Sequence, residues 1–276
     1  MKMPTSTVTI LGLGSLLSER SSRSTFPDLI NFRLGRVSNK YRRVFGHPAS
    51  IFFQRELADM TTKEMSSLSA EEFDFIADAD TISTISPDDA YRGGFICSVF
   101  EVPREQVFLD EEDSDGAIIT KPTGAFLERE EEFNIGEVPF VDFDTDDDDD
   151  DDDDDVDVVA TTATKPTKMG ILCTRFTDKG FVERWGKDRF DENYGKYGIQ
   201  TIWGWKPDSG LLPCRVYLRH CYLAAKSMGP KCFNSFLDET FLVDRSTTIR
   251  QYMKENCPDL IEKTIPPPGF EERYSG

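Results

Sequence analysis

Residues that build metal and redox centres are scarce in this sequence. It contains two histidines, His47 and His220, in 276 residues. That number is too small for a histidine-rich metal site. Its six cysteines are scattered, and none stands in the C-x-x-C spacing that zinc sites and thiol–disulfide enzymes use. We therefore expect reduced structural thiols, no metal and no cofactor.

Long apolar runs are also missing. No stretch approaches the roughly 18–20 consecutive apolar residues that a membrane-spanning helix needs. The first residues lack the succession of basic, apolar and small residues that marks a secretory signal. The sequence therefore predicts a cytoplasmic protein without a membrane partner.

Basic residues are outnumbered by acidic ones, 32 to 51, which gives a net charge of −19. The excess is local, because residues 142–157 contain 13 aspartates, and without them the net charge rises from −19 to −6. Negative charge repels phosphates, which argues against nucleic acid as a partner. The tract could attract basic proteins or divalent cations weakly, although a solvated spacer is the simpler interpretation. It lacks the glycine and ligand spacing of an EF-hand loop.

The remaining chain has the composition of a packed body, with 38% hydrophobic residues and 21 phenylalanines. Alternating apolar residues predict strands at 7–14, within 31–54, at 92–102 and from 170. Helical spacing predicts short helices at 124–135, 178–195, 216–229 and around 246–255. Loops are expected at 56–89 and 196–213. We expect one domain from residues 1–141 and 169–260, a disordered acidic insertion at 142–168, and a C-terminal tail at 261–276.

The N-terminal strand runs into Gly12-Leu13-Gly14-Ser15-Leu16. A dinucleotide-binding loop would need a third glycine, a following helix and an acid about 20 residues later. Leu17 occupies the position of that glycine, and the next predicted strand ends in Arg and Val. This disfavours a nucleotide-binding enzyme. Two interpretations stay open: a plain structural turn, or a backbone cradle for an anion, in which glycine allows close approach and positive φ.

Several motifs taken in order resemble the γ-glutamylcyclotransferase family. That family carries Tyr-Gly-Ser-Leu or Tyr-Gly-Ser-Asn after its first strand, where this sequence has Leu13–Leu16. The family's catalytic helix reads L-D-x-R/Q-E, which is similar to Leu127–Glu131 here. A tyrosine opens a late helix in the family, as Tyr217 does here. The strands KYRRVF and GGFICSVFEV lie between these motifs, so the resemblance spans roughly residues 7–140 and 169–230.

The resemblance implies an α+β fold with a small mixed or closed β-barrel-like sheet flanked by helices. It also implies an enzyme that cyclises a γ-glutamyl group to 5-oxoproline and releases an amine or amino acid. The substrate would be glutathione, a γ-glutamyl amino acid or a γ-glutamylamine. Because the substrate's own α-amine attacks its γ-carbonyl, such an enzyme needs a near-attack conformation and a proton carrier, without a nucleophile, metal or cofactor of its own.

On this resemblance Glu131 is the acid/base. It follows Leu127 by one helical turn, on a face that we expect to be half-buried, where the pKa of a carboxyl would be raised. A register slip of one residue would give the role to Glu130, and a solvated acidic helix is the structural alternative.

Substrate binding is expected from the glycine loop and from one tyrosine: Gly12, Leu13, Gly14, Ser15, Leu16 and Tyr217. Two interpretations of Tyr217 stay open: its hydroxyl donates a hydrogen bond to the γ-glutamyl part of the substrate, or it is a core tyrosine. Leu13 departs from the family's tyrosine. This departure keeps a second hypothesis open: a non-catalytic binding protein of the same fold that uses the glycine loop or the acidic tract.

Overall fold

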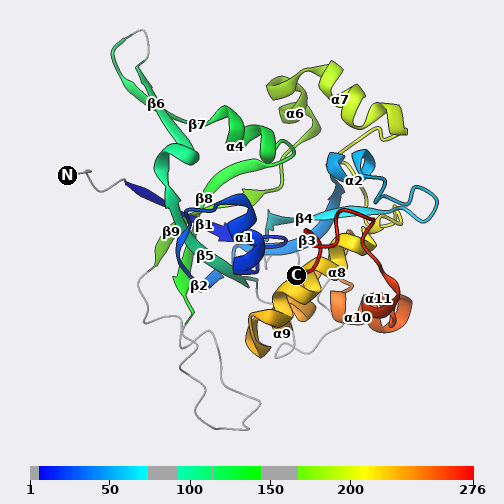
Figure 1. Ribbon diagram of the computed structural model, residues 1–276. Coiled ribbons are helices and arrows are strands. Elements are labelled where there is room, and N and C mark those ends of the chain that lie inside the picture. The colour runs from blue at the N-terminus through cyan, green and yellow to red at the C-terminus, as the bar shows by residue number, and fades with distance from the viewer. Residues whose placement is uncertain (1–5, 74–92, 113–114, 144–166) are drawn as a thin grey trace, which may run out of the picture.

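The structure of the chain is a computed structural model, and it describes residues 6–73, 93–112, 115–143 and 167–276. Figure 1 shows strands gathered on one side of the molecule and most of the helices on the other. The larger sheet contains β1 (Thr7–Gly12), β2 (Ile30–Val37), β3 (Tyr41–Pro48), β4 (Glu64–Glu72), β5 (Phe95–Pro103), β8 (Asn134–Asp142), β9 (Lys168–Thr174), β10 (Leu212–Pro213) and β11 (Thr240–Phe241). A separate hairpin consists of β6 (Phe108–Glu112) and β7 (Ile118–Pro122).

Five strands of the larger sheet close a ring. β1 pairs with β5, β5 with β2, β2 with β8 and β8 with β9, all antiparallel. The ring closes where β9 returns to β1 in parallel, through Ile10 and Ile171. β4 joins β9 at Ala70 and Thr174 and continues the sheet to β3 and β11. The expected fold class, α+β with a closed mixed sheet, is confirmed.

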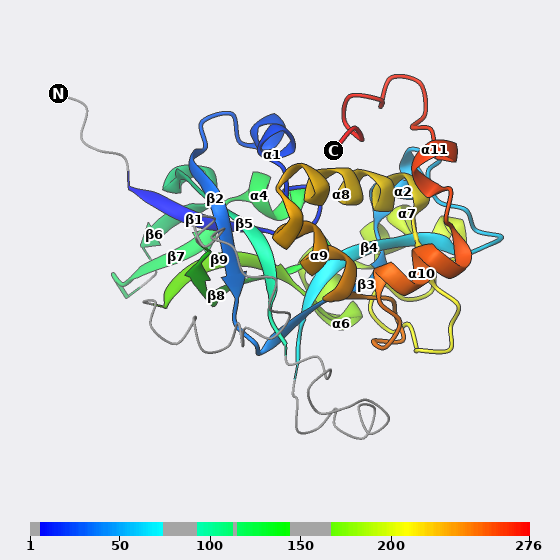
Figure 2. The same cartoon turned by 90° about the horizontal axis from the view of Figure 1, so that it is seen from below.

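Short helices flank this barrel (Figure 2). They are α1 (Glu19–Thr25), α2 (Ser50–Gln54), α4 (Gly124–Arg129), α6 (Asp178–Trp185), α7 (Lys187–Asn193), α8 (Arg215–Ser227), α9 (Pro230–Asp238), α10 (Ile249–Asn256) and α11 (Leu260–Lys263). Among the described residues, no helix combines the length and the apolar character that crossing a membrane requires.

α8 matches its sequence pattern closely. Its buried residues recur at helical spacing, and the small Ala224 and Ala225 let the helix pack tightly on the core. Near its start, the Tyr217 ring lies 5.2 Å from the Phe52 ring and 6.2 Å from the Phe45 ring, measured between centroids. This packing fixes where the Tyr217 hydroxyl can point.

The helix expected at 124–135 is shorter than predicted. α4 ends at Arg129, Glu130 caps it, and β8 begins at Asn134. Glu131 therefore lies after the helix, and the prediction that it shares a buried helical face with Leu127 is wrong. Its burial has another cause, which is described below.

Further differences concern individual elements, and they include residues 51–53, which lie in the helix α2 and not in a strand. The helix expected at 178–195 is broken by Gly186, whose φ of 84° favours glycine, into α6 and α7. The loop expected at 56–89 contains β4, whose residues are buried without interruption from Met65 to Glu71, so the strand lacks the apolar–polar alternation that marks a half-buried strand. Residues 230–238 form α9, which the sequence analysis did not predict.

Most of the expected acidic insertion, residues 144–166, lies outside the described residues. Its two ends are strand residues, since Asp142 ends β8 and Lys168 begins β9, and their side chains form an ion pair. At the other end of the chain, the expected tail packs on the domain, with Tyr274 only 4% exposed.

Candidate active site

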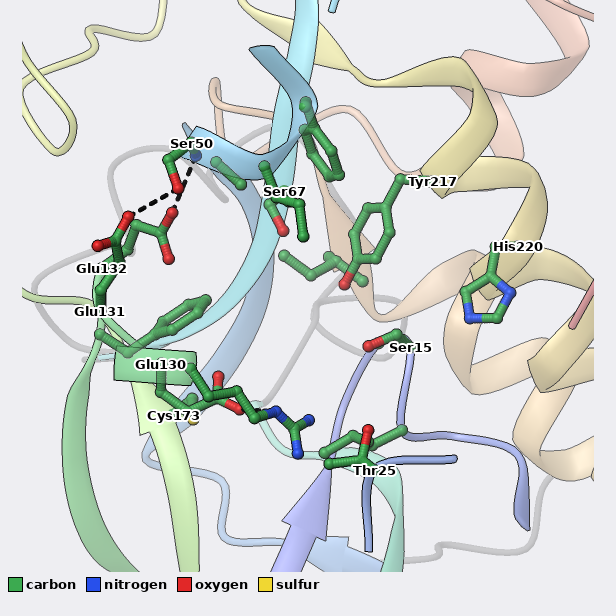
Figure 3. Close-up of a pocket in the computed structure, with 18 of the residues that line it drawn as sticks. Ser15, Thr25, Ser50, Ser67, Glu130, Glu131, Glu132, Cys173, Tyr217 and His220 are labelled. Atoms are coloured by element: carbon green, nitrogen blue, oxygen red, sulfur yellow. Dashed lines mark hydrogen bonds and ion pairs between the residues drawn. The ribbon is translucent and has the colours of Figure 1, made fainter. Parts of the chain in front are cut away.

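A cavity of about 530 Å³ opens between the end of β1, α1, α2, the α4–β8 connection and α8. This volume suits a small-molecule ligand. Its lining includes most of the residues singled out from the sequence: Leu13, Gly14, Ser15, Leu16, Glu130, Glu131 and Tyr217. Gly12 does not line it and lies one residue earlier, at the end of β1. The cavity thus brings together three segments that are far apart in the sequence (Figure 3).

The two glycines of the loop are required by close contacts. A Cβ atom on Gly12 would lie 2.4 Å from the Ser98 Oγ, and one on Gly14 would lie 2.3 Å from the Tyr217 hydroxyl oxygen. Neither glycine has positive φ. The close approach of neighbouring side chains, and not an unusual backbone conformation, therefore explains why glycine stands at both positions. A hydrogen bond of 3.0 Å from the Leu17 N–H to the Gly14 carbonyl closes the turn.

Tyr217 is both a core residue and a pocket residue. Its ring is buried, while its hydroxyl lies over Gly14 and, in Figure 3, points toward Ser15. Burial raises the pKa of Tyr217 well above its usual value, although contacts with the Ser67 side chain and the Ser15 backbone act in the opposite direction. The hydroxyl is therefore protonated at neutral pH.

His220 lies three residues after Tyr217 on the same side of α8 and also lines the cavity. Its Nδ1 accepts a hydrogen bond of 3.0 Å from the Gly276 N–H. The neutral ring then carries its proton on Nε2, which is 3.4 Å from the Ser21 Oγ. Burial lowers the pKa of His220 to about 4. His220 was not predicted as a site residue, although its spacing of three residues from Tyr217 is a signal in the sequence that could have found it.

Glu131 is held by a dense set of donors. Its Oε1 accepts from the Ser50 hydroxyl at 2.7 Å and from the Asn193 amide at 2.9 Å. Its Oε2 pairs with the Arg189 guanidinium, at 3.0 Å from Nε and 2.8 Å from the terminal nitrogen. These bonds use the four acceptor positions of a carboxylate. Tertiary partners on α2 and α7 therefore explain why Glu131 is buried.

Glu132 is also buried and also bonds to Ser50. Its Oε1 accepts from the Ser50 N–H at 2.9 Å and from the Tyr194 hydroxyl at 2.7 Å. Burial, with a further contribution from the charge of Glu131, raises the pKa of Glu132 to about 7. Glu132 was not predicted as a site residue, since nothing in the run of glutamates distinguishes it.

Glu130 has fewer partners. Its carboxylate pairs with the Arg129 Nε at 2.9 Å and contacts the Cys173 thiol, whose pKa is raised by burial and by this carboxylate. The Arg129 guanidinium in turn stacks on the Phe26 ring, 4.8 Å from its centroid. In Figure 3 the Glu131 and Glu132 side chains are directed at Ser50, and Glu130 lies apart from them beside Cys173. Glu130 therefore keeps acceptor positions for a ligand.

No cluster of three or more His, Cys, Asp or Glu side chains that could hold a metal ion occurs in the described ranges. No protein-family model and no curated protein matches the sequence. Among solved structures, the chain is similar to a γ-glutamyl cyclotransferase specific to glutathione from yeast. The two are 13% identical over 82% of this chain and 89% of that chain, with a TM-score of 0.43. At that identity the likeness concerns the fold alone.

Proposed function

We propose that this protein cyclises a small γ-glutamyl compound to 5-oxoproline and releases an amine or amino acid. The observation that carries the proposal is the division of the cavity between two kinds of wall. The glycine-loop backbone and the Tyr217 hydroxyl form a donor wall, and Glu130, Glu131 and Glu132 form an acidic wall. A γ-glutamyl group carries an ammonium and a carboxylate on one carbon, so a cavity with separate acceptor and donor walls complements it.

In the proposed reaction, the α-nitrogen forms a bond to the γ-carbonyl carbon and the amide bond to the leaving nitrogen breaks. The α-nitrogen loses protons, and the leaving nitrogen gains them. Because the attack is intramolecular, the protein contributes a folded substrate conformation and a proton carrier. A carboxylate that can reach both nitrogens is able to serve as that carrier.

Two glutamates remain candidates for this role. The family motif places it at Glu131, and a slip of one residue places it at Glu130. The hydrogen bonds favour Glu130, because Glu131 would have to give up Ser50, Asn193 or Arg189 before it could accept a proton from substrate. We therefore propose Glu130 as the acid/base, and Glu131 as the residue that ties α2 and α7 to the acidic wall.

The donor wall would bind the groups of the substrate that carry negative charge. Tyr217 has a protonated hydroxyl that can donate to the γ-carbonyl oxygen as it becomes an oxyanion. Ser15 and the loop backbone lie beside it and can donate to the same oxygen or to the α-carboxylate. Leu13, which stands where the family has tyrosine, is buried in the core as well as lining the cavity. This packing supports a structural role for its side chain.

The proposal is tested by measuring 5-oxoproline release from glutathione, γ-glutamyl amino acids and γ-glutamylamines. Wild type is compared with Glu130→Gln, Glu131→Gln and the control Glu137→Gln, which changes an exposed glutamate of β8 outside the cavity. We expect release by wild type and the control, and a loss of about 10²- to 10⁴-fold in Glu130→Gln.

The outcomes separate the alternatives. A larger loss in Glu131→Gln, with Glu130→Gln active, would keep the reaction and return the role to Glu131. No release by folded wild type from any of these substrates would contradict the proposal and leave a binding protein of the same fold.

A further inference from the structure

The last residues of the chain form part of the cavity wall. We call residues 264–276 the C-terminal segment. It leaves α11, crosses above α8 and ends beside α1, as both views show (Figures 1 and 2). Two of its residues, Arg273 and Tyr274, line the cavity. From the sequence, both residues were expected in a C-terminal tail without an assigned role.

Hydrogen bonds and a cation–aromatic contact hold this segment in place. The Tyr274 carbonyl accepts from the Arg219 guanidinium at 3.4 Å, and its hydroxyl accepts from the Arg55 guanidinium at 3.3 Å. Arg55 also stacks on the Phe270 ring, 4.8 Å from its centroid. The Gly276 N–H bonds to His220, which is itself a cavity residue. The segment is thus attached to α2 and α8, the helices that shape the cavity.

Arg273 differs from the two other arginines of the cavity. Arg129 is paired with Glu130 and Arg189 with Glu131. In the part of the chain that the structure describes, no carboxylate pairs with Arg273, and its side chain is exposed at the cavity. Its positive charge lies close enough to His220 to lower the pKa of that residue, although burial is the larger cause. A guanidinium without an ion-pair partner among the described residues therefore stands beside His220, at the donor-wall end of the cavity.

We propose that Arg273 binds a carboxylate of the substrate, and that the C-terminal segment is a specificity-determining part of the site. A guanidinium matches a carboxylate in charge and in its paired donor geometry. This inference rests on the proposed function for the identity of the substrate. A γ-glutamyl compound offers two sources of carboxylate: the α-carboxylate that all of them have, and a second one on the leaving group when that group is an amino acid or peptide.

The test measures kcat and KM of wild type, Arg273→Ala, Arg273→Lys and Arg20→Ala. The substrates are a γ-glutamyl amino acid and a γ-glutamylamine, which has no leaving-group carboxylate. Arg20 is the matched control, because it forms an exposed ion pair with Glu272 of the same segment and does not line the cavity. We expect Arg273→Ala to raise KM about 10- to 100-fold with kcat changed much less. Arg273→Lys should recover part of the loss, and Arg20→Ala should resemble wild type.

The substrate dependence identifies the carboxylate. If KM of Arg273→Ala rises with both substrates, Arg273 binds the α-carboxylate. If KM rises with the γ-glutamyl amino acid alone, Arg273 binds the carboxylate of the leaving group. Unchanged KM in Arg273→Ala with both substrates would overturn the inference while the proposed function stands.

Binding measured by calorimetry separates the two proposals when turnover is absent. If wild type releases no 5-oxoproline, the proposed function fails. A γ-glutamyl amino acid that still binds wild type, and binds Arg273→Ala about 10- to 100-fold more weakly, supports the carboxylate site. Equal binding by both proteins, or no binding by wild type, overturns it.

Discussion

The two walls of the cavity are stabilised in different ways. The donor wall consists of a glycine loop pressed against an aromatic core, with Tyr217 packed on Phe45 and Phe52. The acidic wall consists of three consecutive glutamates that are held by polar partners, with Ser50 donating to two of them. Shape fixes the first wall and hydrogen bonding fixes the second. Substitutions that change volume should therefore damage the donor wall, and substitutions that change charge or donors should damage the acidic wall.

Among the substitutions that test this contrast between the walls, Gly14→Ala should have the largest effect. The added methyl group would lie 2.3 Å from the Tyr217 hydroxyl oxygen, so the loop or α8 has to move. We expect a loss of about 100-fold or more in 5-oxoproline release, because displacements of about 1 Å at a reacting site have effects of that size. Unfolding free energy should fall by about 1–3 kcal/mol, measured by denaturant titration.

A double substitution checks that this clash is the cause. In Gly14→Ala combined with Tyr217→Phe, the atom nearest to the methyl group is removed, and the next atom of that ring lies at 3.4 Å. The double variant should be more stable than Gly14→Ala alone, and equal stability would show that Tyr217 is not what the methyl group meets.

The second prediction concerns the acidic wall and how the free energy of unfolding depends on pH. Burial raises the pKa of Glu132 to about 7 in the folded protein, above its value of about 4.5 when unfolded. Between these two pH values the folded state therefore binds more protons than the unfolded state. The ionisation of Glu132 lowers the free energy of unfolding as pH rises from about 4.5 to 7, and it lowers it no further at higher pH. The size is on the order of 2–3 kcal/mol.

Glu132→Gln should remove this dependence. The buried His47 and His220, with pKa values of about 3 and 4, change stability in the opposite direction over part of the same range. The measurement is therefore the difference in unfolding free energy between Glu132→Gln and wild type at pH 4.5 and at pH 7.5. The variant should gain relative to wild type as pH rises, and a constant difference would contradict the assignment.

The smallest effect is expected for Ser50→Ala. It removes one hydroxyl donor from Glu131 but keeps the backbone N–H that bonds to Glu132. We expect a loss of about 1 kcal/mol in unfolding free energy. In Glu131→Gln the same serine substitution should matter less, and a double-mutant cycle measures that coupling. Additive losses would show that the hydroxyl does not stabilise Glu131.

The same contrast explains what the sequence could predict. Four of the five barrel strands, β1, β2, β5 and β9, and the helix α8 follow from apolar periodicity, whereas β8 was not predicted. The glycine loop could be matched to Tyr217 through the order of motifs. The partners of Glu131 could not be found in this way. Ser50 precedes it by 81 residues and Asn193 follows it by 62, and neither spacing carries a local signal.

The role of the C-terminal segment was hidden for a similar reason. Residues 264–276 have no periodic pattern, and they are ordered by single contacts, such as those of Arg55 with Phe270 and Tyr274. Local sequence patterns predict helices and strands, whereas long-range polar and cation–aromatic contacts form only when the chain is folded.

The central claim is that this cavity cyclises a γ-glutamyl group, and isotope labelling tests it most directly. A γ-glutamyl amino acid that carries ¹⁵N at the free α-amine of its γ-glutamyl residue is incubated with the purified protein. The products are then distinguished by mass. The account predicts labelled 5-oxoproline together with an unlabelled amino acid, because the α-nitrogen becomes the ring nitrogen. Labelled glutamate as the product would show hydrolysis in place of cyclisation, and that result would contradict the account.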